Sequence, residues 1–300
     1  NYTEDDVKAC ARAFTGWNLA PTIPVFPYGR TPFEFRFDPA DHDFGEKTFL
    51  GETGPWNGED IVDIICKQPA TARFIARKMY DFFVADEPPV PSWRQSEPRD
   101  MEAIKTLEKA YFDSGYEITA MLRALFTSGF FKSESVRYAK VKSPAEVVIG
   151  TLRMVGQHTG PEPGLFFVAM EPKYMGMDLM NPPTVEGWHT GAEWINSGTL
   201  IDRINFAAGL LGDTDLPGVK SIVGRLMDGS DAIRPEDFVD GCLDLTGPLT
   251  VAEEPRSELV AHVQSGGELR HGSESERKNF SQRNGEMLQL IATKSEFQFG

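Results

Sequence analysis

The sequence predicts a mainly α protein, a multi-helix globular bundle with one small β hairpin near residues 33–50. Three observations support this fold class. Apolar residues recur at three- and four-residue spacing in most segments, which is the period of an amphipathic helix. Strands and helices do not alternate in βαβ order, and the sequence has no internal repeat. With 300 residues, 40% of them hydrophobic, the chain can bury one large core or two moderate ones.

The first predicted helix covers residues 4–15. Thr3 and Asp6 have the spacing of a capping box, in which each side chain bonds to the backbone N–H of the other residue. Val7, Cys10, Ala11 and Phe14 continue from there as one apolar stripe, and Gly16 is a common helix stop.

Residues 18–57 are rich in proline and glycine, which predicts an irregular loop. Within it, the alternating FEFRF at 33–37 indicates a strand, and KTFL at 47–50 is expected to be the strand that pairs with it. The loop between them is longer than a tight hairpin turn.

Helices dominate the rest of the chain. Ser143, Pro144 and Glu146 mark one helix start clearly, because they combine a cap, a first-turn proline and a capping-box glutamate. Helices are predicted at 59–68, 69–85, 98–113, 117–128, 144–157, 173–180, 198–211 and 280–293, and two or three short helices are predicted over 217–265. The spacing in 198–211 predicts that Leu200, Ile201, Ile204, Ala207, Ala208 and Leu211 are buried.

Two domains are expected. Residues 1–212 form a helical core with the hairpin inserted at 18–57, and residues 213–300 form a C-terminal helical subdomain. The polar segment SGGELRHGSESERKN at 265–279 is predicted to be a connector inside that subdomain.

Composition limits the partners of this acidic chain. Thirty basic and forty-five acidic residues give a formal charge of -15, which repels phosphate backbones, so nucleic acid is not an expected partner. The apolar runs fall short of the roughly 20 residues that a membrane span needs, so we expect a soluble chain without one. The three cysteines have neither zinc-site nor disulfide-framework spacing.

The loop DPADHDFGEK is the first candidate site. Asp38, Asp41, His42 and Asp43 are candidate ligands of a divalent metal, calcium through the carboxylates or a transition metal through the imidazole. No other cofactor is evident. His42 and Asp43, with Lys47, are also candidate catalytic residues, because adjacent His and Asp can act as acid and base. The alternative is structural: the aspartates cap turns and His42 bonds to the backbone.

Other stretches are candidate ligand-binding surfaces. Arg73 and Arg77 lie four residues apart, and they could bind a carboxylated ligand or pair with acidic neighbours. In NPPTVEGWHTGAEWINSG, Trp188 and Trp194 could pack between helices or offer a ledge to a sugar or peptide. Trp17, after the first helix, is a further candidate. The sequence lacks the nucleophile-elbow, HExxH, Walker and Rossmann motifs.

Six ordered stretches carry a family resemblance. They are NYTEDDVKACARAFTGW, HDFGEKTFLG, DIVDIICKQPATARFIARKMYDFFV, KSPAEVVIGTLRMVG, PPTVEGW with WINSGTLIDRINFA, and LIATKSEFQ. Together they resemble the bacterial family called domain of unknown function 1800, over residues 1–210 and again over 286–298. His42, Asp43, Gly45 and Lys47 match the family motif, whereas Asp38 and Asp41 do not.

The resemblance implies a mainly helical protein without an established reaction. Family members usually carry a further N-terminal helical region, which implies that this chain is the C-terminal part and lacks its own N-terminal region and targeting segment. The resemblance further implies export, since many members are exported and are often encoded beside a sulfatase-like partner family, so a periplasmic or extracellular location and an envelope protein partner are expected. We therefore predict an envelope or secreted binding or assembly component. The alternative is a hydrolase or metal-dependent enzyme that uses the His42 and Asp43 loop.

Overall fold

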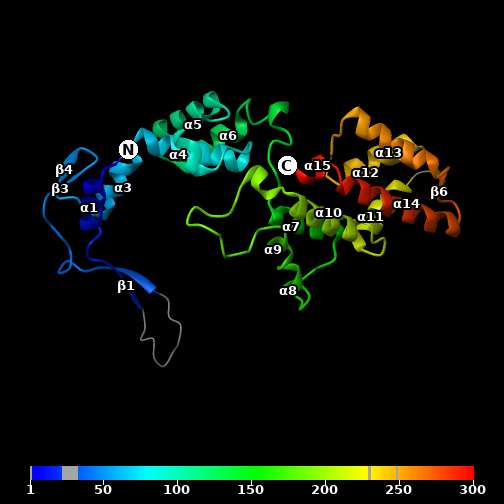
Figure 1. The fold of residues 1–300 in the computed structure, drawn as a ribbon, viewed down its shortest axis with the longest axis horizontal. Helices are drawn as coiled ribbons and strands as arrows, with labels where there is room; N and C mark the ends of the chain where they lie inside the picture. Colours follow the sequence, from blue (N-terminus) through cyan, green and yellow to red (C-terminus); the bar gives the residue numbers. More distant parts are fainter. Residues whose placement is uncertain (1, 22–32, 229–230, 248) are drawn as a thin grey trace. The chain divides into compact units, whose positions relative to one another are not determined.

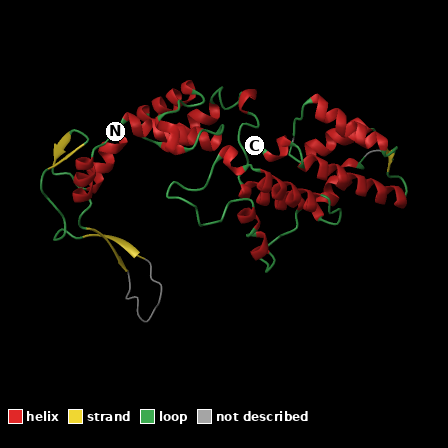
Figure 2. Cartoon of the chain, in the orientation of Figure 1, coloured by secondary structure: helices red, strands yellow, loops and turns green. Residues whose placement is uncertain are grey.

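The computed structural model describes residues 2–21, 33–228, 231–247 and 249–300. In these residues the fold is mainly α, as predicted, and it contains three two-stranded sheets where one small hairpin was predicted (Figures 1 and 2).

Contacts divide the chain into two compact units. Unit 1 comprises Asn1–Tyr80 and Asp100–Ser128, and unit 2 comprises Asp81–Arg99 and Gly129–Gly300. The predicted domain division between 212 and 213 falls inside unit 2, because the helices on both sides of that position pack together there.

The first part of unit 1 is built around helix α1, Glu4–Ala13, which packs on strand β3, Lys47–Phe49, and on helix α3, Gly58–Cys66. The predicted capping box at Thr3 and Asp6 is present. Asp6 also accepts a hydrogen bond from the backbone N–H of Leu50 at 2.7 Å, which ties the start of α1 to the turn after β3. The buried core of this part is Ala9, Ala13, Phe49, Ile61 and Ile64.

The second part of unit 1 consists of most of α4, Pro69–Phe83, which ends in unit 2 after Tyr80, and of α5, Met101–Asp113, and α6, Ile118–Thr127. Helices α5 and α6 pack on each other. The Tyr111 hydroxyl donates to the Cys66 carbonyl at 2.9 Å, which links α5 to the end of α3.

The predicted pairing of the β hairpin is wrong. Strand β2, Phe33–Phe37, pairs with β1, Trp17–Pro21, while β3 pairs with β4, Glu52–Gly54. Leu50 and Gly51 explain the second pairing, because their φ angles of 48° and 87° give the two-residue turn that closes a tight hairpin. Because of that turn, β3 pairs with β4, the next strand in the chain. Strand β2 pairs with the preceding strand, β1.

Unit 2 is a larger helical assembly. None of the helices in the described residues is both long and apolar enough to cross a membrane. The described α-helices of unit 2 are α7 (Pro144–Val155), α8 (Leu165–Val168), α9 (Glu171–Tyr174), α10 (Ser197–Leu211), α11 (Pro217–Leu226), α12 (Pro235–Leu245), α13 (Glu253–Ser265), α14 (Glu274–Ala292) and α15 (Ser295–Gln298).

Shorter elements complete unit 2. The 3-10 helices are η1, Val90–Arg94, η2, Glu134–Val136, and η3, Gly191–Trp194. Strands β5, Ala232–Ile233, and β6, Leu269–Arg270, pair antiparallel. The predicted connector at 265–279 is therefore partly ordered, since β6 lies inside it and α14 begins within it.

Helix α10 buries part of the predicted stripe: Ala207 and Leu211 are fully buried, and Leu200, Ile204 and Ala208 are half-buried. Arg203 is fully buried together with Ala207 and Leu211, whereas Ile201 is 57% exposed. Arg203 donates from Nε to the side-chain oxygen of Gln298 at 3.2 Å and from Nη2 to the Lys142 carbonyl. These hydrogen bonds allow Arg203 to be buried beside the predicted apolar residues, although the spacing of apolar residues did not predict it.

Two glycines of α11 provide a matched test of this packing. A Cβ at Gly218 would lie 1.9 Å from the Met154 carbonyl oxygen of α7, so Gly218→Ala is expected to destabilise the protein by about 1–3 kcal/mol. A Cβ at Gly224 would meet nothing within 4 Å, so Gly224→Ala is expected to stabilise it by up to about 1 kcal/mol. Chemical denaturation of both variants measures the two effects, and equal effects would contradict the α7–α11 contact.

Candidate functional site

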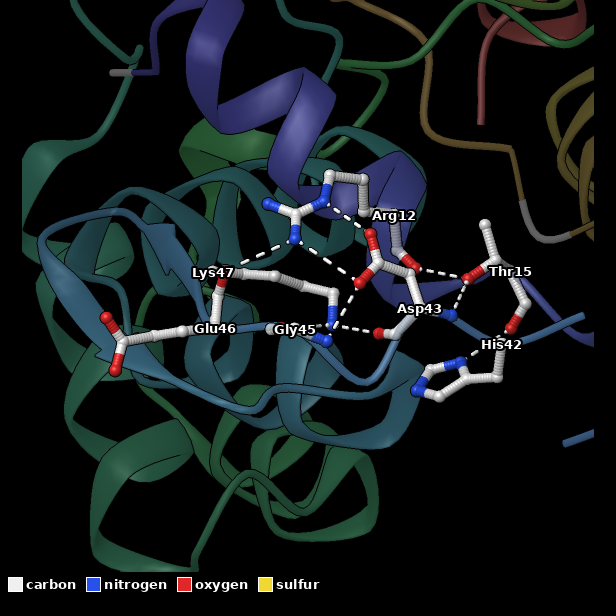
Figure 3. A network of polar contacts seen from close by, with 7 residues as sticks. All are labelled: Arg12, Thr15, His42, Asp43, Gly45, Glu46 and Lys47. Atoms are coloured by element: carbon white, nitrogen blue, oxygen red, sulfur yellow. Dashed lines mark hydrogen bonds and ion pairs between the residues drawn. The ribbon is translucent and has the colours of Figure 1, made fainter.

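The end of α1 and the loop before β3 form one polar network in unit 1 (Figure 3). Arg12 lies in the last turn of α1. Thr15 follows it, and its hydroxyl donates to the Arg12 carbonyl at 2.6 Å and accepts from the Asp43 N–H at 2.8 Å. The network therefore joins residues that are about thirty positions apart in the sequence.

Arg12 and Asp43 form the central ion pair. Arg12 Nε lies 2.6 Å from Asp43 Oδ2, and Arg12 Nη2 lies 3.3 Å from Oδ1, the two-pronged geometry that favours this pair. The Gly45 N–H also donates to Oδ1 at 2.8 Å. The Arg12 guanidinium, then the Gly45 N–H and the Lys47 charge, lower the pKa of Asp43 to about 2. Asp43 is thus held as an anion.

Lys47 lies beneath the loop. Its side chain is 1% exposed, and its Nζ donates to the Gly45 carbonyl at 2.9 Å and to the Asp43 carbonyl. Arg12 Nη2 donates to the Glu46 carbonyl at 3.3 Å. These bonds fold the loop around two cations, so Lys47 supports the loop from inside.

His42 bonds to the backbone and not to the Asp43 carboxylate. Its Nδ1 lies 2.7 Å from the Thr15 carbonyl oxygen, and because a carbonyl only accepts, Nδ1 carries the proton. Figure 3 shows the ring turned away from the carboxylate. Phe37 and Phe44 contact the ring edge-on, with centroids 5.2 and 4.5 Å away. The structure does not form the acid–base pair that the sequence suggested.

The predicted metal ligands are not gathered. Asp38 accepts a hydrogen bond from the Ala40 N–H at 3.0 Å, as a turn cap does, and Asp41 is exposed. Asp43 is engaged by Arg12. In the part of the chain that the structure describes, no three His, Cys, Asp or Glu side chains could hold a metal ion together. These four side chains, as placed, do not fit a metal.

Trp17 anchors the β1–β2 hairpin beside this network. Its ring packs edge-on against Phe14 and Phe35, with centroids 4.9 and 5.0 Å away. A Cβ at position 58 would lie 2.5 Å from the Trp17 ring, so Gly58 leaves the room that the ring occupies. At Gly16, the φ angle of 78° turns the chain from α1 into β1.

The two arginines of α4 have structural surroundings. Arg73 Nε lies 2.8 Å from Glu108 Oε1 of α5, and Arg77 is 3% exposed. Arg73 thus pairs with an acidic neighbour within the fold, and Arg77 is buried.

The tryptophan stretch lies in unit 2. Trp194 is 5% exposed, and Asn196 caps α10. Trp188 is half-buried, and its indole N–H donates to the Asp178 carbonyl at 3.0 Å. This arrangement matches the packing-and-capping interpretation for Trp194, whereas Trp188 retains an exposed part.

An exposed apolar surface was not predicted. Leu19, Phe33 and Phe35 are 73%, 61% and 58% exposed on β1 and β2. The alternation in FEFRF indicated a strand, but no pattern showed that WNLAP would pair with it. We call the face made by Trp17, Leu19, Pro21, Phe33, Phe35 and Phe37 the ribbon face.

One family matches the chain. The family described as a protein of unknown function, DUF1800, matches residues 1–299. The match includes residues 211–285, which the six sequence stretches did not cover. No curated protein and no solved structure matches the chain.

The ion pair makes stability depend on pH. The pKa of Asp43 is lowered to about 2 in the folded state, against about 3.9 for an unfolded aspartate. Its contribution should be fully present above pH 4 and be lost as the pH falls through about 2. The melting temperature of Asp43→Asn should therefore lie below that of the wild type at pH 7, with a gap that narrows in acid. Asp41→Asn is the control, and a gap that does not change with pH would contradict the ion pair.

Substitution of the two tryptophans tests which one is structural. Trp194→Ala is expected to lower the free energy of unfolding by about 3–5 kcal/mol, as for a buried aromatic residue. Trp188→Ala should cost less, because Trp188 is only half-buried. Denaturant titration ranks the two variants, and a larger loss for Trp188→Ala would overturn the assignment.

Proposed function

This chain belongs to the DUF1800 family of proteins of unknown function, and we propose that it is a binding or assembly component whose ribbon face docks a protein partner. The observation that carries the proposal is the exposure of this face, because contiguous apolar surface rimmed by polar groups is typical of interaction sites. The proposal includes an envelope protein as the partner and a periplasmic or extracellular location, both of which rest on the family resemblance.

The register of β1 and β2 gathers the apolar side chains on one side. Trp17 lies opposite Phe37, Leu19 opposite Phe35, and Pro21 opposite Phe33. Directly opposite residues share a face of an antiparallel pair, and alternate residues of a strand share a face as well. All six side chains therefore lie on the ribbon face.

The other side of the hairpin is polar. Asn18 lies opposite Arg36, and Ala20 opposite Glu34. Because one side of the hairpin is apolar and the other carries polar residues, an apolar partner surface would bind to one side only. The same chain thus supplies control positions for an experiment on this surface.

Energy and rigidity both favour docking. Burying a leucine or phenylalanine contributes roughly 1.5–3 kcal/mol, so covering Leu19, Phe33 and Phe35 supplies a useful share of a binding energy. A two-stranded hairpin is marginal by itself in water. Here its base is held, since Trp17 packs on Phe14 and the Asp38 N–H donates to the Gly16 carbonyl at 2.7 Å.

Site-specific photo-crosslinking in the producing cell tests the proposal. A crosslinking residue at position 19, on the ribbon face, should form one discrete protein adduct, whereas the same residue at Glu34, on the polar side, should not. The purified partner should then bind Phe33→Ser at least about tenfold more weakly than the wild type. The melting temperature should hardly change, because Phe33 is already exposed.

Glu34→Gln is the matched control in the neighbouring position. Its binding should equal that of the wild type. Equal adducts from positions 19 and 34, or full binding by Phe33→Ser, would refute the ribbon face as the docking surface.

A further inference from the structure

A cleft in unit 2 has the features of a ligand site, independently of the ribbon face. Its volume is about 660 Å³, within the range of roughly 300–1,000 Å³ of small-molecule sites. Helices α11 and α14 and the turn after α10 line it. None of the candidate residues from the sequence lies there.

Glycines shape this cleft. A Cβ at Gly212 would lie 2.1 Å from Gln289 Nε2, so a larger residue in the turn after α10 would displace the flexible Gln289 side chain, which lines the cleft. Gly224 lines the cleft from α11, and a Cβ there would meet nothing within 4 Å. The missing side chain leaves open space in the middle of a helix, where glycine is otherwise unfavourable.

Cations without carboxylate partners lie along α14. Arg277 and Lys278 line the cleft, and among the described residues neither forms an ion pair; Arg277 donates only to the Gly272 carbonyl, at 3.4 Å. Lys220, the third cation, pairs with Asp215 at 3.1 Å. The chain has a net charge of -15, but these two adjacent cations, which form no ion pair among the described residues, attract an anion locally.

Other groups in the cleft suit a carbon skeleton with hydroxyl groups. Val223 and Met227 offer apolar surface. Asp215 and Glu286 are acceptors, and Glu286 holds the Gln282 amide at 3.1 Å. Carboxylates of this kind repel a bare anion but accept hydrogen bonds from hydroxyl groups.

We propose that this cleft binds a small hydroxylated organic oxyanion. Arg277 and Lys278 hold its charged group, the carboxylates accept from its hydroxyls, and its carbon atoms lie against Val223 and Met227. A carboxylate or a phosphate group would satisfy the same cations, so the two sources must be separated by experiment.

Isothermal titration of the full chain with four related probes tests this proposal. Glucuronate and glucose 6-phosphate carry the skeleton with a carboxylate or a phosphate, glucose lacks the charge, and inorganic phosphate lacks the skeleton. At least one charged sugar should bind at least about tenfold more tightly than glucose and inorganic phosphate. The preferred one identifies the group that the cations hold.

Two changes to the cleft should abolish this preference. Gly224→Phe should fill the open space, and the double variant Arg277→Gln with Lys278→Gln should remove the charge, each weakening binding at least about tenfold. Arg225→Gln, a change on α11 outside the cleft, should bind as the wild type does. If Gly224→Phe fails to fold, the double variant decides the question.

Three outcomes would overturn the proposal. The first is that neither charged sugar binds at concentrations up to about 10 mM. The second is that inorganic phosphate binds as tightly as the charged sugars, which would indicate ion binding only. The third is that both cleft variants bind as the wild type does. None of these outcomes bears on the ribbon face, because that face lies in unit 1.

Discussion

The Arg12–Asp43 ion pair is the interaction on which the presented surface of unit 1 depends. Arg12 Nε, at the end of α1, lies 2.6 Å from Asp43 Oδ2 in the loop before β3. The same segment contains His42 and the buried Lys47. His42 in turn contacts Phe37 at the base of the hairpin. The polar network thus fixes the place from which the ribbon face starts.

The reactive-looking groups of this loop are occupied by structure. A carboxylate with a pKa of about 2 is a poor proton acceptor near neutral pH, and Asp43 has that property because Arg12 and the Gly45 N–H bind it. Lys47 Nζ donates hydrogen bonds to two backbone carbonyls. The hydrogen bonds of the loop therefore connect the end of α1 to the segment before β3.

In unit 2, as in unit 1, a buried cation bonds to groups of the fold. Other cations of unit 2 are exposed at a cleft. Arg203 is buried where its guanidinium can bond to Gln298 and to the Lys142 carbonyl. On α14, by contrast, Arg277 and Lys278 stay in solvent beside an open cleft. Cations inside the fold organise helices, whereas those at the cleft remain available to a ligand.

The sequence by itself determined the local structure of this protein. The capping boxes at Thr3 and Ser143, the stop at Gly16 and the helical spacing of apolar residues all follow from contacts within a few residues, so they could be read directly. The family was also recognisable from the sequence, because six characteristic stretches occur in order. The alternative in which His42 bonds to the backbone was also anticipated.

Only the tertiary structure decided what depends on distant partners. The pairing of β1 with β2 turned on whether β3 closed its own hairpin, and a strand pattern does not name its partner. The burial of Arg203 required Gln298, and the cleft required α11, α14 and the turn after α10 to come together. Such choices are fixed by packing between segments far apart in the chain, which no local spacing encodes.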